Sequence, residues 1–168
     1  PALVVSDVIV VQDNPLLTQA LFPVLTTTNE YNFNIDNNDS LLSFNVPTLI
    51  SVNSTTGNGH FLITNNAVLT TVDISGLLNV ARNVNVDNNT SLTTVTINSG
   101  LVSGTNIYSF TGNALTEAVV DDILNKLDLG GVVNGVLSLE GGTNSTPSAA
   151  GVVSKANLVG KGWTVTNN

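Results

Sequence analysis

Asparagines and aspartates that recur together are the residues of this chain whose types and spacing could do chemistry. Asp13, Asp36, Asp39 and Asp87 each lie within two residues of an asparagine that belongs to a repeating pattern. Hard cations such as Ca²⁺ prefer carboxylate and amide oxygens as ligands. The spacing matches neither an EF-hand loop nor an acidic nonapeptide repeat. We therefore expect no cofactor, with calcium as the lesser alternative.

Two other groups of side chains could support catalysis. His60 is the only histidine, and because the chain has no cysteine, a transition-metal cluster cannot be assembled around it. No G-x-S-x-G motif is present to supply a serine nucleophile. Glu117, Asp121 and Asp122 could form a carboxylate pair of the glycosidase kind, but their spacing favours the polar side of a helix. We therefore predict that the protein is not an enzyme.

The asparagines occupy one fixed position of a sequence repeat. Its clearest copy has apolar residues at Val84 and Val86, then Asn89, then Leu92. Buried polar groups in proteins are almost always hydrogen-bonded, because each unpaired group costs about 1 to 3 kcal/mol. We therefore predict a buried ladder in which the amides bond the backbone of adjacent turns. The ladder asparagines are Asn14, Asn38, Asn66, Asn89 and Asn113.

The apolar positions of the repeat predict how the chain folds. Apolar residues such as Val84 and Val86 occur at every second position, as on the inward side of a strand. The β-branched residues Thr94 and Thr96 occupy the alternate, outward positions on either side of an apolar residue. A self-similar unit of roughly 20 to 30 residues indicates a solenoid, whose repeats bury their apolar faces only by stacking. We predict a mainly β parallel solenoid with two parallel sheets and about five turns.

We expect a single domain over residues 1–168, with an N-terminal cap at 1–7, repeats at 8–115 and a C-terminal α/β cap at 116–168. The cap begins with a helix after Thr116 that Gly130 ends, followed by a strand over residues 135–139. Thr146 is the expected N-cap of a second helix, with Pro147 at its first position. A last strand begins at Trp163, and this unit should close the open end of the solenoid.

One copy of the repeat is longer than the others. The extra residues fall within 53–59, where two glycines favour turn conformations. Insertions in solenoids collect in loops and often on the binding face. The residues of this candidate contact loop are Asn53, Ser54, Thr55, Thr56, Asn58 and His60.

Charge excludes two classes of partner. The formal net charge is −8, only 10% of residues are charged, and Arg82 is the only basic residue before Lys126. Nucleic-acid binding needs a basic stripe and binding to anionic membranes needs basic clusters, so we expect neither. No apolar run reaches the roughly 18 to 20 residues of a membrane span, so we expect no insertion. Threonine pairs suggest ice binding, but they are not in register between copies.

The repeats FLITNNAVLTTVDI and VNVDNNTSLTTVTI resemble the leucine-rich-repeat, receptor L-domain-like repeats of bacterial surface proteins. The tail, in particular GGTNSTPSAAG and GWTV, is similar to the C-terminal cap on such repeats in bacteroidete surface proteins and in tailed-phage virion proteins. The resemblance implies a right-handed leucine-rich-repeat-like solenoid. It also implies adhesion, recognition or virion modules without enzymatic activity.

We therefore expect a non-enzymatic structural or surface protein of a bacteriophage virion, of the spike, fibre or decoration type, that could recognise a host surface. Its partners would be other virion proteins or copies of itself, and a host surface glycan or protein. The N-terminal residues lack the basic region and long apolar core of a signal peptide, which favours the virion surface as its location. The alternative is a leucine-rich-repeat adhesion or carbohydrate-binding module that is extracellular or on the bacterial cell surface.

Overall fold

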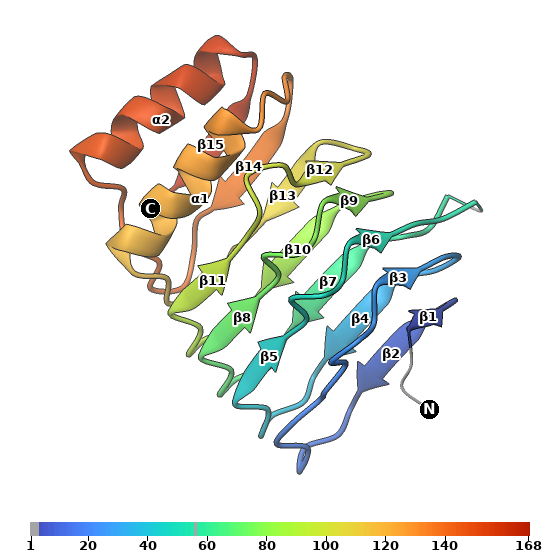
Figure 1. Cartoon of the computed structure of the whole chain (residues 1–168). Helices are drawn as coiled ribbons and strands as arrows, with labels where there is room; N and C mark the ends of the chain where they lie inside the picture. The colour runs from blue at the N-terminus through green and yellow to red at the C-terminus, as the bar shows by residue number, and fades with distance from the viewer. Residues whose placement is uncertain (1–3, 56) are drawn as a thin grey trace.

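The computed structural model describes residues 4–55 and 57–168, which form three parallel β-sheets and two helices (Figure 1). The seven-stranded sheet contains β2 (Ile9–Gln12), β4 (Phe33–Asp36), β7 (Phe61–Thr64), β10 (Val84–Asp87), β13 (Ile107–Ser109), β14 (Val136–Leu139) and β15 (Thr164–Asn167). The five-stranded sheet contains β1 (Val5–Ser6), β3 (Thr27–Thr28), β6 (Ser51–Val52), β9 (Asn79–Val80) and β12 (Val102–Ser103). The three-stranded sheet contains β5 (Ser43–Asn45), β8 (Thr71–Asp73) and β11 (Thr94–Thr96). The helices are α1 (Glu117–Leu129) and α2 (Ala149–Gly160).

Equivalent positions of successive repeats stack on one another. Ile9 pairs with Phe33, Phe33 with Phe61, and Phe61 with Val84, always in parallel. These side chains point inward and are buried, whereas the residues between them face outward. The fold is therefore mainly β with parallel sheets, and it is compatible with a β-solenoid.

The number of sheets differs from the sequence-based expectation of two. The additional sheet is built from strands of only two residues, which flank the buried leucines Leu25, Leu49, Leu77 and Leu101. Two residues cannot display the alternation by which a strand is recognised in a sequence, because that pattern needs at least four. The sequence pattern therefore assigned these segments to turns.

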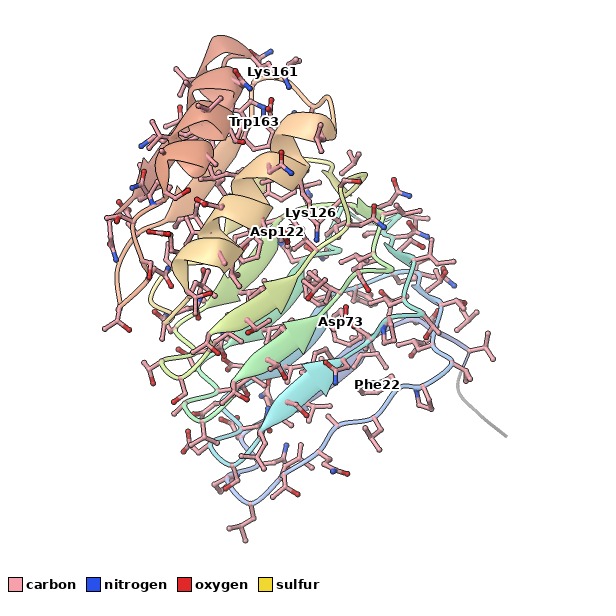
Figure 2. All side chains as sticks on the ribbon, turned by 60° about the vertical axis from the view of Figure 1, so that its left-hand side comes forward. Phe22, Asp73, Asp122, Lys126, Lys161 and Trp163 are labelled. Carbon is pink, nitrogen blue, oxygen red and sulfur yellow. The ribbon has the colours of Figure 1, made fainter. Side chains whose placement is uncertain are left out.

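The core runs through the inside of the stacked repeats. At the first repeats it is aromatic: Phe33 stacks on Phe61 with ring centroids 5.2 Å apart, and Phe22 contacts Phe33 edge-on. Phe22 lies at the opposite end of the molecule from Trp163 (Figure 2). Trp163 is buried and stacks on Tyr108 at 5.5 Å. Large aromatic groups thus fill both ends of the core.

The three-stranded sheet ends at β11. Beyond it, the C-terminal helices take its place and cover the continuing seven-stranded sheet. Helix α1 buries Val120, Ile123, Leu124 and Leu127, and β14 and β15 extend the seven-stranded sheet beyond β13 by two parallel strands. The unit between residues 116 and 168 therefore adds two helix-strand pairs to the stack of repeats.

The start of the second helix corrects a sequence-based prediction. Its N-cap is Ser148, whose hydroxyl accepts a hydrogen bond from the Ala150 N–H, and not Thr146. Ser148 is favoured because its hydroxyl also donates to Asp121 on α1, a contact from a distant part of the sequence. Within the described residues, no helix is long and apolar enough to cross a membrane.

A left-handed residue precedes each ladder asparagine of the second to fourth repeats. Asn37, Asn65 and Asn88 have φ values of 55°, 56° and 58°, and Gly112 takes the same place before Asn113 with φ 67°. Asparagine and glycine enter this region at the lowest cost. The first asparagine of each Asn-Asn pair therefore makes the turn, and the second enters the core.

Substitutions at Asn88 test this conformational role. Asn88→Gly should leave the free energy of unfolding nearly unchanged, whereas Asn88→Val should lower it by about 1 to 2 kcal/mol, because a β-branched residue is strained at positive φ. Urea denaturation measures both values. Thr94→Val, at an exposed strand position, is the control and should be neutral. Equal stability of the two Asn88 variants would contradict the assignment.

Candidate functional site

The structure joins all five ladder asparagines in one row, because Asn14 also donates to Asn38 Oδ1, and it buries four of them. Asn38, Asn66, Asn89 and Asn113 are fully buried, whereas Asn14 at the first repeat is exposed. The Asn38 N–H and Nδ2 donate to Asn66 Oδ1 at 3.0 and 3.3 Å, and the Asn66 N–H and Nδ2 donate to Asn89 Oδ1 at 3.0 and 3.1 Å. The amides therefore form one continuous hydrogen-bonded row with a single direction.

Each amide also bonds the backbone of its own and the preceding repeat. Asn89 Nδ2 donates to the carbonyl of Ile63 at 2.9 Å and to that of Asp87 at 3.1 Å. Asn66 Nδ2 does the same with Ile35 and Thr64. The donor and acceptor of each of these amides are thus engaged inside the protein. These asparagines hold repeats together and present no group to a ligand.

A further buried asparagine that the repeat pattern missed is Asn144, which shares the Phe110 carbonyl with Asn113 at the end of this row. Asn144 is 4% exposed, its Oδ1 accepts the Leu115 N–H at 2.9 Å, and its Nδ2 donates to the carbonyls of Phe110 and Leu139. Its position five residues after Leu139, the end of β14, was the available signal. The helix between Asn113 and Asn144 obscures the repeat period there.

The aspartates near the ladder bond neighbouring repeats across the outer face of the seven-stranded sheet. Asp36 Oδ1 accepts the Thr64 hydroxyl at 2.6 Å and Asn65 Nδ2 at 2.9 Å. Asp87 Oδ1 accepts the Ser109 hydroxyl at 2.7 Å and both the N–H and the hydroxyl of Thr111. Protein hydrogen-bond donors thus surround oxygens that the sequence suggested as cation ligands.

The remaining two of those aspartates lie at exposed positions. Asp13 Oδ1 accepts Asn37 Nδ2 at 2.7 Å, and Asp39 is exposed beside Asn38. In the part of the chain that is described, no three His, Cys, Asp or Glu side chains gather where they could hold a metal ion. The calcium alternative therefore has no assembled ligand set among these residues.

The outer face of the seven-stranded sheet carries mostly polar side chains, with Val10 and Leu62 among them. One row of its side chains comprises residues in register from strand to strand, namely Asn34, Leu62, Asn85, Ser109, Ser138 and Thr166. The row beside it contains Asp36, Thr64 and Asp87. We call this surface the outer sheet face. Hydroxyl, amide and carboxylate groups repeat along it at the strand spacing of about 4.8 Å.

The candidate contact loop at 53–59 joins β6 to β7 and is bound to repeats on both sides. The Thr55 hydroxyl donates to the Glu30 carboxylate at 2.7 Å, and the N–H groups of Gly59 and His60 donate to Asn32 Oδ1. From the other side, Arg82 Nε donates to the Gly57 carbonyl. The loop is therefore anchored at several points.

Side chains of the candidate contact loop differ in their exposure. Asn53, Thr55 and Asn58 are exposed, whereas Ser54 and His60 are half-buried. Thr56 lies outside the described residues. Asn53, Thr55 and Asn58 are thus the side chains that a ligand could reach directly.

His60 has an electrostatic environment that favours its neutral form. Burial lowers the pKa of His60 below its usual 6.5, and the nearby positive charge of Arg82 lowers that pKa further. Its Nδ1 faces the Asn83 N–H at 3.4 Å, which also suits an unprotonated nitrogen. His60 is therefore neutral at pH 7.

The carboxylates of the first helix make structural contacts. Asp121 accepts the N–H and the hydroxyl of Ser148 and so holds the start of α2. Asp122 forms an ion pair with Lys126 at 2.8 Å on the surface of α1 (Figure 2). Glu117 is exposed in the first turn. The structure assigns two of these three acids to contacts within the C-terminal unit.

Comparisons with known proteins found no relative. No protein-family model, no curated protein and no solved structure matches this chain. The site must therefore be interpreted from its own geometry.

The ladder can be tested with the same substitution at its centre and at its end. Asn89→Ala leaves the Asn66 N–H and the Ile63 carbonyl without their partner inside the core, so the free energy of unfolding should fall by about 2 to 4 kcal/mol. Asn14→Ala, at the exposed end, should cost less than about 1 kcal/mol. Chemical denaturation measures both, and similar losses for the two variants would contradict the ladder.

The electrostatic effect of Arg82 on His60 can be measured by NMR titration, because the chain has one histidine. Arg82→Gln should raise the pKa of His60 part of the way to 6.5, since burial remains, whereas Arg82→Lys should change it less. Because the folded state has the lower pKa, the unfolded state takes up the proton first. Stability should therefore fall as the pH drops below 6.5. An unchanged pKa in Arg82→Gln would disprove the coupling.

Proposed function

We propose that the protein is a non-enzymatic structural or surface protein of a bacteriophage virion that recognises a host surface. In this proposal the chain is a right-handed, leucine-rich-repeat-like solenoid of about five turns with a C-terminal α/β cap. The resemblance of its repeats and tail to surface and virion proteins supports the proposal. The stacked parallel strands and a composition poor in charged residues and rich in hydroxyl and amide groups support it as well.

The observation that carries the recognition role is the regular spacing of polar groups on the outer sheet face. A rigid scaffold with hydroxyl and amide groups at strand spacing can make hydrogen bonds to an extended polar ligand without losing side-chain entropy at each contact. A surface polysaccharide, which repeats hydroxyl groups along its length, fits this chemistry. The anchored loop at residues 53–59 adds Asn53, Thr55 and Asn58 beside the sheet.

A second candidate is a bacterial cell-surface adhesion or carbohydrate-binding module. The same outer sheet face favours it, because recognition by such a module would use the same polar groups. The two candidates differ in where the protein resides, on the virion surface or on a bacterial surface. Probing purified phage particles and cell envelopes with an antibody against the protein separates them.

Surface plasmon resonance against a panel of bacterial surface polysaccharides tests recognition. We expect binding to at least one polysaccharide without release of reducing ends. Ser138→Arg, on strand β14 of the outer sheet face, should weaken this binding by at least about tenfold. Thr94→Arg, on the three-stranded sheet, is the matched control and should bind normally. Release of reducing ends, or equal losses for the two variants, would contradict the proposal.

A further inference from the structure

The seven-stranded sheet is open at both of its ends. In the described residues, β2 pairs only with β4 and β15 only with β14, so each has one edge without a strand partner. These strands lie at opposite ends of the molecule (Figure 1). An unpaired strand edge offers backbone donors and acceptors for the addition of another strand.

The two open edges have complementary hydrogen-bond phases. In each strand pair, the backbone groups of inward-facing residues on the earlier strand bond the backbone groups of outward-facing residues on the later strand. Examples are the bonds from Ile9 N–H to Asn32 O and from Thr164 N–H to Gly135 O. The inward positions of β15 and the outward positions of β2 are therefore the ones left unpaired. If β2 of a second copy were added to β15, its outward positions would bond the inward positions of β15. This is the hydrogen-bond pattern already present between all neighbouring strands of this sheet.

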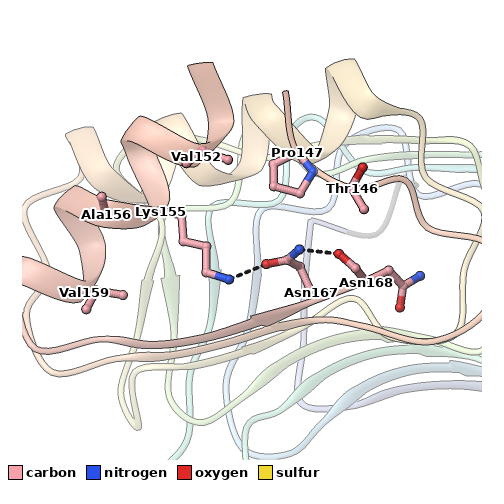
Figure 3. Close-up of a pocket in the computed structure, with 8 residues that line it drawn as sticks. All are labelled: Thr146, Pro147, Val152, Lys155, Ala156, Val159, Asn167 and Asn168. Atoms are coloured by element: carbon pink, nitrogen blue, oxygen red, sulfur yellow. Dashed lines mark hydrogen bonds between the residues drawn. The ribbon is translucent and has the colours of Figure 1, made fainter. Parts of the chain in front are cut away.

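The C-terminal end exposes an apolar surface beside β15. Val152, Ala156 and Val159 lie on one side of α2 at helical spacing, and the two valines are each 53% exposed. With Pro147 and Asn167 they line a pocket of about 560 Å³ between α2 and β15 (Figure 3). The layer of helix and sheet thus ends with its apolar interior partly open.

The N-terminal end exposes two leucines, one of them at a position that is polar in the next repeats. Leu21 is 74% exposed, and the equivalent residues of the next repeats are Asn45 and Asp73. Leu16 is 88% exposed and corresponds to Ser40 of the second repeat and to Val68, which is 39% exposed, of the third. Leucines exposed to 74% and 88% at the open end of the array indicate that this end is covered by another surface.

Charge and the ladder indicate that the covering surface is the opposite end of the same protein. Lys155 lies in the C-terminal pocket and has no ion pair with a described residue, while Asp7 and Asp13 are exposed at the N-terminal end. Two N-terminal ends would bring aspartates together, whereas an N-terminal end against a C-terminal end would bring them to Lys155. Asn14 Oδ1 accepts no hydrogen bond from the described residues, unlike Asn66 and Asn89 within the ladder.

We propose that copies of this chain assemble head to tail, with β2 of one copy added in parallel to β15 of the next. The leucines of the first repeat then cover the pocket between α2 and β15, and Lys155 approaches Asp7 or Asp13 of the neighbouring copy. Such a contact joins two different surfaces, so it repeats and builds a filament unless the rotation closes a ring. The assembly requires neither the phage origin nor the polysaccharide binding proposed above.

Variants that block one end each provide the test. Leu21→Glu blocks the N-terminal surface and Val159→Glu blocks the C-terminal surface, and both positions are exposed, so folding should be retained. Analytical ultracentrifugation should show that the unmodified protein forms larger species as its concentration rises. Each variant alone should stay monomeric. An equimolar mixture of the two should form dimers and nothing larger, because only one productive pair of ends remains.

Two controls and three results decide the outcome. Leu42→Glu, at an exposed leucine in the second repeat, should assemble like the unmodified protein, and circular dichroism should show all variants folded. A monomeric unmodified protein at all concentrations would overturn the proposal. Self-association of Val159→Glu alone would indicate contact between two N-terminal ends and would also overturn it. A mixture that stays monomeric would do the same.

Discussion

The fold depends on a row of buried side-chain amides. Asparagine carries both a donor and an acceptor, so one amide can accept bonds from the repeat before it and donate to that repeat's backbone. Asn66 and Asn89 do this while fully buried, where an unpaired group would be costly. The left-handed residue before each of them, such as Asn65 or Asn88, turns the chain so that the amide enters the core. Apolar stacking drives association of the repeats, and the amides set their register.

This arrangement determines where function can lie. The buried ladder amides are engaged between repeats, and Asp36 and Asp87 bond the repeats that follow them. What remains for partners is the rest of the outer sheet face, the loop anchored by Arg82 and Asn32, and the two ends of the array. These surfaces differ chemically. The outer sheet face is polar and regular, as a glycan requires, whereas the ends are apolar with unpaired strand edges.

The sequence predicts the parts of the fold that a buried repeat fixes. Inward residues such as Phe61 and Asn89 recur because each occupies a buried position that tolerates few side chains. It does not reveal the two-residue strands, which are too short to alternate, or the extension of the sheet by β14 and β15, where helices interrupt the period. Of the candidate site, the location of the loop follows from its extra length. Its anchors do not, because Glu30 and Arg82 come from other repeats.

Amide hydrogen exchange measured by NMR tests the central claim most directly. The N–H groups of Asn66 and Asn89 each donate to the side chain of the next asparagine, so their exchange should require global unfolding. Their protection should therefore equal that of the slowest strand amides, and the N–H of Asn14, whose bond to Asn38 Oδ1 is longer at 3.3 Å and lies at the exposed end of the row, should exchange faster. Exchange of Asn66 and Asn89 as fast as that of Asn14, with the strands still protected, would show that the ladder does not hold the repeats together.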